Sequence, residues 1–430
     1  MPVHNNDNLM KHLTIGVFFL ILMSGGLLFI ATPKEKISVD EKRELAQMPE
    51  VSREAIFQGT YFKNIDSYVS DNFIFRKHLT EIAAFMKSFR GKPMDDIEVV
   101  DQEKKPVINP EVSALDKNKL KAQLAPDQLV KDKVDNDPYE NIESVIIYKG
   151  RAIQMIGMSE NNMRLLSKVI NEYKEEFGKS VKIYFMAFPI GADFYLPTKI
   201  TRGTQKERIL IDFMHSQLSE DIVKVDVYNA LVPHQDEYIY FKTDHHWTGL
   251  GAYYAFDAFT KVAQLEPLPL STLTKKVIPN YLGSLYQRTE STALKASGDT
   301  VEYFKIPNVT TSKIYNNVND SGNAASLYAE YARGSLGYGV FLGGDFPLMK
   351  ITSDVKNGQK VLIIKDSYGN AFAPYLASRY EETYIIDYRY FNGNIKKLIQ
   401  DNGIQSIIFA HNTYVIQSSY TAKQERQFLH

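Results

Sequence analysis

The segment VLIIKDSYGN at residues 361–370 decides the fold. Its four leading apolar residues predict a strand buried on both faces, which is typical of a parallel sheet. Lys365 and Asp366 end this strand, and Gly369 with Asn370 opens a helix. Ser367 therefore lies at the carboxyl end of a strand, on the turn into a helix, which is where doubly wound sheets bind their ligands.

Strands and helices alternate around this segment from about residue 142 onward. The alternation predicts a doubly wound, mostly parallel α/β sheet. The stretch 270–350 breaks the rhythm, because it is rich in Gly, Ser, Asn and Tyr, and it is expected to be an insertion. The expected strands are 144–148, 152–155, 181–188, 222–227, 359–364, 384–386 and 405–410, and the expected helices are 162–177, 205–218, 248–263, 369–378 and 395–401.

Composition divides the chain into regions of different character. Residues 37–50 and 61–89 mix helical patterning with charge, which favours a helical stalk or cap. Residues 101–140 are rich in Lys, Asp, Gln and Pro, which is typical of a linker or mobile insert. The expected organisation is a cytoplasmic stub at 1–12, a transmembrane anchor at 13–32, a helical stalk or cap at 33–100, a polar linker at 101–140 and an α/β domain at 141–430.

The run at 13–32, LTIGVFFLILMSGGLLFIAT, carries no charge. As a helix it would extend about 30 Å, the thickness of the hydrocarbon core of a membrane. We expect a single signal anchor in the cell membrane, with the remaining chain outside the cytoplasm. The alternative is a cleaved signal peptide, which leaves the bulk of the chain on the same side.

The overall composition excludes several classes of function. Lys plus Arg number 50 and Asp plus Glu number 51, a net charge of −1, so a nucleic-acid partner is not expected. Hydrophobic residues make up 44%, which is typical of a globular chain. Cysteine is absent, which excludes disulfides, thiolate zinc sites, iron–sulfur clusters and a cysteine nucleophile. No cofactor is expected.

A second segment, KTDHHWT at 242–248, supplies the chemistry that a serine needs. A serine hydroxyl is a poor nucleophile without a base that a third group orients. His246 would take the proton of Ser367, and Asp244 would fix the imidazole tautomer. The helix that follows Ser367 offers backbone N–H groups for a developing negative charge. Together the two segments predict a serine-dependent acyl-transfer site.

Each segment also has a simpler interpretation. Ser367 alone resembles a helix N-cap. The Asp-His-His run alone is typical of a polar turn or of a metal site on Asp244, His245 and His246. Adjacent side chains of an extended segment point to opposite sides, so both imidazoles on one ion are not expected, and no metal is assigned.

These two segments resemble the signature motifs of the bacterial DHHW protein family. The first match is TDHHW at 243–247, and the second is IKDSYGN at 364–370. That family is similar to the alginate O-acetylation proteins of the SGNH hydrolase-like superfamily. The resemblance implies that Ser367 is the nucleophile, His246 the general base and Asp244 its orienting partner. The Asp-x-His before the Ser implies a rearranged strand order relative to ordinary SGNH hydrolases.

Further residues are candidates for oxyanion or substrate binding. The backbone N–H of Ser367 is the first donor, and Gly344 in the turn 343–345 is a second. Asp345 stands where an amide is expected, and an ionised carboxylate cannot donate. The remaining candidates are the Asn370 side chain, Tyr368 beside the serine, Arg389, which would meet an anionic glycan or pair with Asp387, and His411 at the rim, for which a plain surface position is the alternative.

The resemblance implies O-acetylation of a cell-surface or secreted polysaccharide. A membrane-bound O-acyltransferase (MBOAT) would then pass the acetyl group to this protein, and the anchor at 13–32 would hold the two together. Three alternatives remain open. They are an acetylesterase with the same triad, a non-catalytic glycan-binding scaffold and a metal-dependent enzyme.

Overall fold

The computed structural model describes residues 139–430 except 143, 202–205 and 317–320, together with scattered positions between 16 and 73. The chain divides into two compact units, Met1–Met94 and Asp95–His430. The predicted linker lies outside the described residues as far as 138, and so does most of the predicted anchor. Within the described part of the chain, no helix has the length and hydrophobicity needed to cross a membrane.

The described residues of the first unit include a short hairpin and a helix of twelve residues. Strand β1 (Ile37–Ser38) pairs antiparallel with β2 (Arg43–Glu44), so the helical interpretation of this stretch is wrong. Helix α3 (Thr60–Asp71) agrees with the first part of the helical pattern predicted at 61–89, and residues 74–89 lie outside the described residues. The ring of Tyr68 in this helix contacts the ring of Phe29 edge to face, with centroids 6.0 Å apart.

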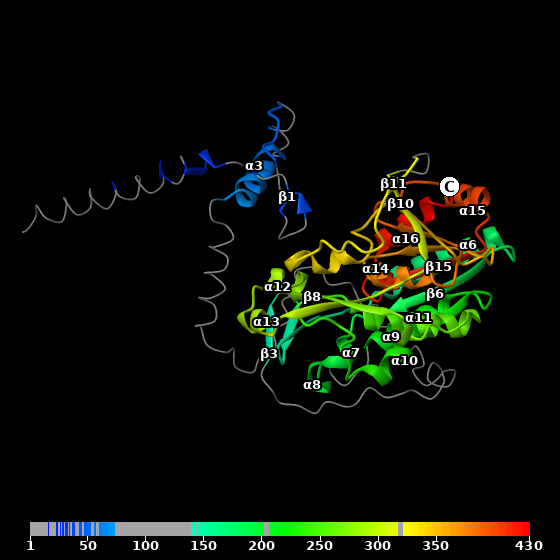
Figure 1. The fold of residues 1–430 in the computed structure, drawn as a ribbon. Helices are drawn as coiled ribbons and strands as arrows, with labels where there is room; N and C mark the ends of the chain where they lie inside the picture. The colour runs from blue at the N-terminus through cyan, green and yellow to red at the C-terminus, as the bar shows by residue number, and fades with distance from the viewer. Residues whose placement is uncertain are drawn as a thin grey trace, which may run out of the picture. The chain divides into compact units, whose positions relative to one another are not determined.

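An eight-stranded sheet forms the centre of the second unit (Figure 1). The five strands from β14 to β7 are parallel, and β12, β10 and β11 extend them antiparallel. The predicted α/β class is confirmed, and the sheet is mixed because three of its strands are antiparallel. The strands in spatial order are β11 (Asn323–Ala324), β10 (Val309–Tyr315), β12 (Leu348–Ser353), β14 (Glu382–Asp387), β13 (Lys360–Lys365), β15 (Ser406–Asn412), β6 (Lys182–Phe188) and β7 (Val223–Val225).

Helices cover both faces of the sheet. Consecutive strand residues point to opposite sides, and both sets of side chains are buried in strands such as β6. On β6, Tyr184 meets Phe259 of α11 at 5.1 Å, whereas its neighbour Phe185 meets His215 of α9 at 5.9 Å. One layer contains α11 (Gly249–Ala263) and α14 (Gly369–Leu376), and the other contains α6 (Glu160–Phe177), α9 (Lys206–Gln217), α15 (Ile395–Asn402) and α16 (Ser419–Gln427).

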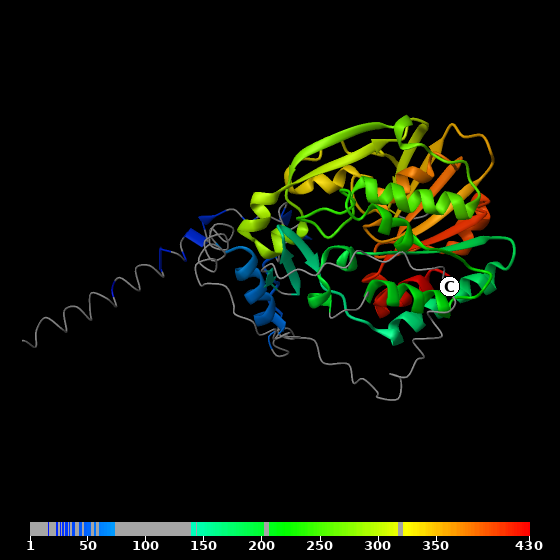
Figure 2. The same ribbon diagram turned by 90° about the horizontal axis from the view of Figure 1, so that it is seen from below.

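The stretch 270–350 is part of the sheet framework and not merely an insertion, which corrects the expectation from sequence. It supplies the three antiparallel strands named above. It also forms the long ribbon β8 (Thr274–Tyr281) with β9 (Asp299–Lys305), whose two strands lie side by side in Figure 2. Consecutive polar residues, such as Thr310–Lys313 in β10, conceal the strand pattern of this stretch in the sequence.

A small antiparallel sheet borders the site. It consists of β3 (Tyr139–Ile142), β4 (Val145–Tyr148) and β5 (Arg151–Gln154). The last two strands were expected from sequence, but they do not join the central sheet. The remaining short helices are α7 (Ala192–Tyr195), α8 (Thr198–Thr201), α10 (Val227–Leu231), α12 (Ser284–Thr289) and α13 (Thr292–Ser297).

Candidate active site

The turn between β13 and α14 exposes Ser367 because its neighbours are tied down. Asp366 Oδ1 accepts the Tyr368 N–H at 2.8 Å, and Oδ2 accepts the Asn412 N–H of β15 at 2.7 Å. A Cβ at Gly369 would lie 2.5 Å from Lys365 Cβ, so only glycine fits the start of this helix. The turn is thus held in shape while the serine stays partly exposed.

The segment 243–247 is fixed against this turn by its tryptophan. Trp247 is fully buried, and its Nε1–H donates to the Tyr368 carbonyl at 3.0 Å. Thr248 then caps α11 by accepting the Gly251 N–H through its side chain. These contacts bring two segments together that are more than one hundred residues apart in the sequence.

Asp244, His246 and Ser367 form a continuous chain of hydrogen bonds. His246 Nδ1 lies 2.6 Å from Asp244 Oδ1, and His246 Nε2 lies 2.8 Å from Ser367 Oγ. An ionised carboxylate only accepts, so Nδ1 carries the ring proton and Nε2 accepts the serine O–H. This tautomer is the one in which the imidazole can take a proton from the serine.

Two further groups hold the carboxylate of Asp244. Tyr281 OH donates to Oδ2 at 2.7 Å, and the Ser284 N–H donates to the same oxygen at 2.8 Å. Complete burial acts to raise the pKa of Asp244, but the charges of His246 and His245 and the hydrogen bonds outweigh it, and the pKa lies well below its usual range. Asp244 therefore remains ionised. Sequence reasoning missed Tyr281 and Ser284, because only the path of β8 brings them here.

His245 and His246 lie on the same side of the segment, which corrects the expectation that they point apart. Their ring centroids are 3.8 Å apart, because the segment turns and is not extended. One atom of each of Asp244, His245 and His246 that could bind a metal ion lies within 4.8 Å of the other two. His245 Nδ1 contacts Ser284 Oγ at 2.6 Å, so in this arrangement both imidazoles are engaged in hydrogen bonds with protein groups.

Asp345 ties the Gly343–Asp345 turn to both sides of the serine. Its Oδ1 accepts from Lys365 Nζ at 3.0 Å and from Asn370 Nδ2 at 2.8 Å. Gly343 and Gly344 adopt φ of 80° and 139°, which favours glycine at both positions. The turn therefore lies beside the start of α14, and the donation of Gly344 to an oxyanion stays a prediction.

Arg389 belongs to a buried network of ion pairs. It contacts Asp387 and Asp345 at 2.7 Å, and Lys365 Nζ contacts Asp387 at 2.6 Å. Of the two alternatives stated from sequence, the pairing with Asp387 is the one observed. Burial acts to lower the pKa of Lys365, but the charges of Asp345 and Asp387 outweigh it and raise the pKa.

Two other candidates occupy structural positions. Tyr368 is fully buried, and its hydroxyl donates to the His245 carbonyl, so its ring packs the two segments together. His411 is also fully buried, with Nε2 2.6 Å from Glu425 Oε1. His411 lies inside β15, which continues to Asn412, and its side chain is therefore buried in the sheet. Both positions expected from sequence, at the rim and on the surface, are wrong.

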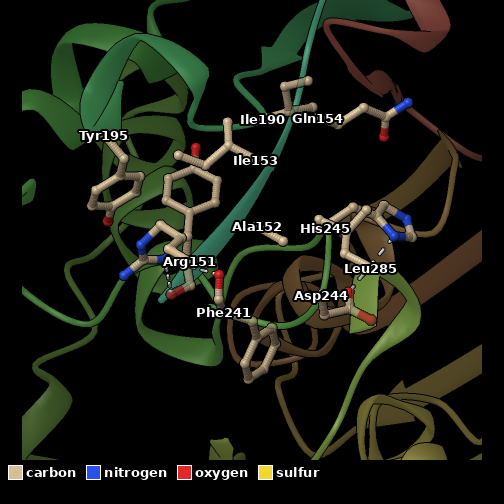
Figure 3. Close-up of a pocket in the computed structure, with 11 residues that line it drawn as sticks. Arg151, Ala152, Ile153, Gln154, Ile190, Tyr195, Phe241, Asp244, His245 and Leu285 are labelled. Atoms are coloured by element: carbon tan, nitrogen blue, oxygen red, sulfur yellow. Dashed lines mark hydrogen bonds and ion pairs between the residues drawn. The ribbon is translucent and has the colours of Figure 1, made fainter. Parts of the chain in front are cut away.

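A small cavity of about 10 Å³ lies beside Asp244 and His245 (Figure 3). It has room for roughly one water molecule. One wall is strand β5, where Arg151 donates to the carbonyls of Tyr240 and Phe241 at 2.9 and 2.8 Å. The three-stranded sheet thus supports the segment that carries the aspartate and the histidines.

Comparison with known proteins identifies the family. The family model described as "DHHW protein" matches residues 114–386. A crystal structure of a DHHW family protein from Eubacterium siraeum is 32% identical, with a TM-score of 0.60, and the match covers 66% of this chain and 96% of that chain. The chain therefore belongs to the DHHW family, as the motifs indicated. No curated protein sequence matches it.

Two structures of Bacillus cereus PatB1 share the fold. The one with a sulfonyl adduct is 19% identical, with a TM-score of 0.55 over 64% of this chain and 98% of that chain. The other is 20% identical, with a TM-score of 0.54 over 66% and 99%. At these identities the likeness shows a common architecture.

Proposed function

We propose that this protein is a serine-dependent O-acetyltransferase that modifies a cell-surface or secreted polysaccharide. The observation that carries the proposal is the hydrogen-bonded chain from Asp244 through His246 to Ser367, with contacts of 2.6 and 2.8 Å. Both distances lie in the range that proton transfer requires. The family resemblance supports acetyl as the acyl group and a polysaccharide as the acceptor.

The reaction runs in two steps that share one base. Ser367 Oγ bonds to the acyl carbon while its proton moves to His246 Nε2, and the carbonyl electron pair moves onto oxygen. The leaving group of the donor departs with that proton. An acceptor hydroxyl then attacks the acetyl-serine and gives its proton to His246, which returns it to Ser367 as the ester bond breaks. Asp244 stays ionised and stabilises the imidazolium.

The oxyanion is stabilised at the start of α14. The Ser367 N–H meets no acceptor among the described residues, so it is available to the developing charge. Gly344 is the second proposed donor, because Asp345 holds its turn next to Asn370. Removal of one such donor typically lowers the rate by about 10²–10³-fold.

Incubation with an activated acetyl ester and an acceptor glycan tests the proposal. We expect acetylated glycan from the wild-type protein and none from Ser367→Ala. Acetate released without glycan modification would identify an acetylesterase, because the same triad serves water as acceptor. Undiminished glycan acetylation in cells that carry Ser367→Ala would point to a non-catalytic scaffold. Activity that survives a strong chelator excludes the metal-dependent alternative.

We also propose that residues 13–32 anchor the protein in the cell membrane beside a membrane-bound O-acyltransferase that supplies acetyl. The uncharged run supports this proposal, because its length matches the hydrocarbon core. We expect the full-length protein to stay with membranes after a high-salt and alkaline wash. Recovery in the soluble fraction would overturn the anchor without affecting the assignment of the triad.

A further inference from the structure

Tyr338 contacts two members of the site at once. It lies on the short helix η4 (Gly334–Val340), inside the stretch that looked like an insertion. Its ring is parallel to the His246 imidazole, with centroids 3.8 Å apart and an interplanar angle of 9°. Its hydroxyl donates to the Ser367 carbonyl at 2.8 Å.

The surroundings of Tyr338 keep its ring in place. The rings of Phe341 and Phe241 meet it edge to face at 5.3 and 6.2 Å. The preceding Gly337 packs against Tyr281, since a Cβ there would lie 2.8 Å from the Tyr281 ring. Burial raises the pKa of Tyr338 well above its usual range, so the hydroxyl stays neutral and continues to donate.

The stack on His246 differs from the other ring contacts around it. His245 is tilted by 37° at 3.8 Å, and Tyr368 is tilted by 50° at 5.1 Å. In the described part of the chain, the titratable side chains in contact with the imidazole are Asp244, His245, Tyr368 and Tyr338. Of the rings among them, Tyr338 alone lies flat, with its electron-rich face against the imidazole.

We propose that Tyr338 is the positioning residue for proton transfer in this site. Its ring fixes the imidazole plane, and its π face stabilises the imidazolium that forms when the Ser367 proton moves to His246 Nε2 as the Oγ–acyl bond forms. Its hydroxyl fixes the turn that carries the serine. The inference rests on the proposed function, because it assigns Tyr338 to the same reaction.

Substitution of Tyr338 separates the two contacts. Tyr338→Phe keeps the ring and removes the hydrogen bond, so kcat for an aryl acetate falls about 3–10-fold. Tyr338→Leu also removes the π face, and kcat falls about tenfold further. We expect KM to stay within twofold in both, because the contacts of Tyr338 are with His246 and Ser367.

Tyr375 offers a matched control. It is buried in α14, stacks on Phe256, and donates to the Gly249 carbonyl at 2.9 Å. Tyr375→Phe and Tyr375→Leu therefore lose a comparable hydrogen bond and stack. We expect similar losses of Tm from both pairs, but kcat within twofold of wild type for the Tyr375 variants.

Two readouts distinguish the inference from the proposed function. The first is the rate of labelling by a sulfonyl fluoride, with Ser367→Ala as the blank. The second is the NMR shift of the His246 ring protons, which the stacked ring moves upfield in wild type and not in Tyr338→Leu. Slower labelling together with loss of the upfield shift supports the inference.

Other results overturn it. If wild type reacts and Tyr338→Leu reacts equally fast, the inference fails and the proposed function stands. If wild type does not react at Ser367, the proposed function fails and the inference with it. Should Tyr338→Leu not fold, Tyr338→Phe decides alone, since an unchanged kcat there contradicts the proposal.

Discussion

Asp244 illustrates how much of the site depends on single charges. Its carboxylate accepts from the His246 ring, from Tyr281 OH and from the Ser284 N–H. An amide at this position has one oxygen and one N–H₂ group, so it cannot accept all of these hydrogen bonds. The change would therefore favour the wrong imidazole tautomer, in which Nε2 carries the proton. Nε2 then cannot accept the hydrogen bond from the Ser367 hydroxyl.

Asp244→Asn is accordingly expected to lower kcat by roughly 10³–10⁴-fold. The measurement is steady-state hydrolysis of an aryl acetate at neutral pH. Asp257→Asn, on the outer side of α11 beside Lys261, is the control and should leave kcat unchanged. A loss smaller than tenfold for Asp244→Asn would mean that the carboxylate does not orient the base.

At the scale of elements, two buried carboxylates join helix α9 to helix α7 and to Ile190 shortly before α7. The Asp193 carboxylate accepts the N–H groups of Lys206, Glu207 and Arg208, and the Glu207 carboxylate accepts the Ile190 N–H and the Thr413 hydroxyl. Burial, with the charge of Glu207, raises the pKa of Asp193 from 3.8 to about 7. The folded protein thus favours the protonated form of Asp193.

The sign of the resulting pH dependence follows from this raised pKa. The stabilisation is fully present below the unfolded value near 3.8 and is lost as the pH rises through about 7, at about 1.4 kcal/mol for each unit of pKa difference. We expect the free energy of unfolding in urea to fall between about pH 4 and about pH 7. In Asp193→Asn the fall should be smaller, and an unchanged slope would contradict the assignment.

The ends of β13 and β14 are joined by buried charges. Lys365 is 1% exposed and contacts Asp387 and Asp345. Lys365→Met leaves two carboxylates with fewer partners, so we expect a loss of roughly 3–5 kcal/mol in the free energy of unfolding. Lys350→Met, at the half-exposed pair with Glu382, should cost less than about 1 kcal/mol. Equal losses in the two variants would show that the buried network contributes no more than a surface pair.

At the scale of the whole molecule, the second unit contains the complete central sheet and every residue of the site. Its strands run from β3 to β15, and its aromatic core joins both helical layers. A chain that begins near residue 136 is therefore expected to unfold in one cooperative transition. Its Tm should lie within a few degrees of the value for the longer chain, and aryl acetate hydrolysis should persist. Loss of cooperativity would mean that residues before 136 contribute to the fold of the second unit.

Much of the parallel framework could be predicted from sequence because its signals are local. The apolar run 361–364 specifies a strand that is buried wherever it lies, and the following Gly369 allows the helix to begin close to it. The position of Ser367 follows from that junction alone. The strands Val309–Tyr315 and Leu348–Ser353 were missed because polar residues interrupt their apolar pattern: Thr310–Lys313 in the first strand, and Lys350, Thr352 and Ser353 in the second.

The sequence by itself determined the α/β class, the family motifs and the three residues proposed for the reaction, since each depends on neighbours within a few positions. Only the tertiary structure decided what surrounds them. Tyr281 on Asp244 and Tyr338 on His246 come from segments with no motif of their own. Contacts between residues distant in the chain depend on how strands and helices pack, and no local pattern of residues encodes them.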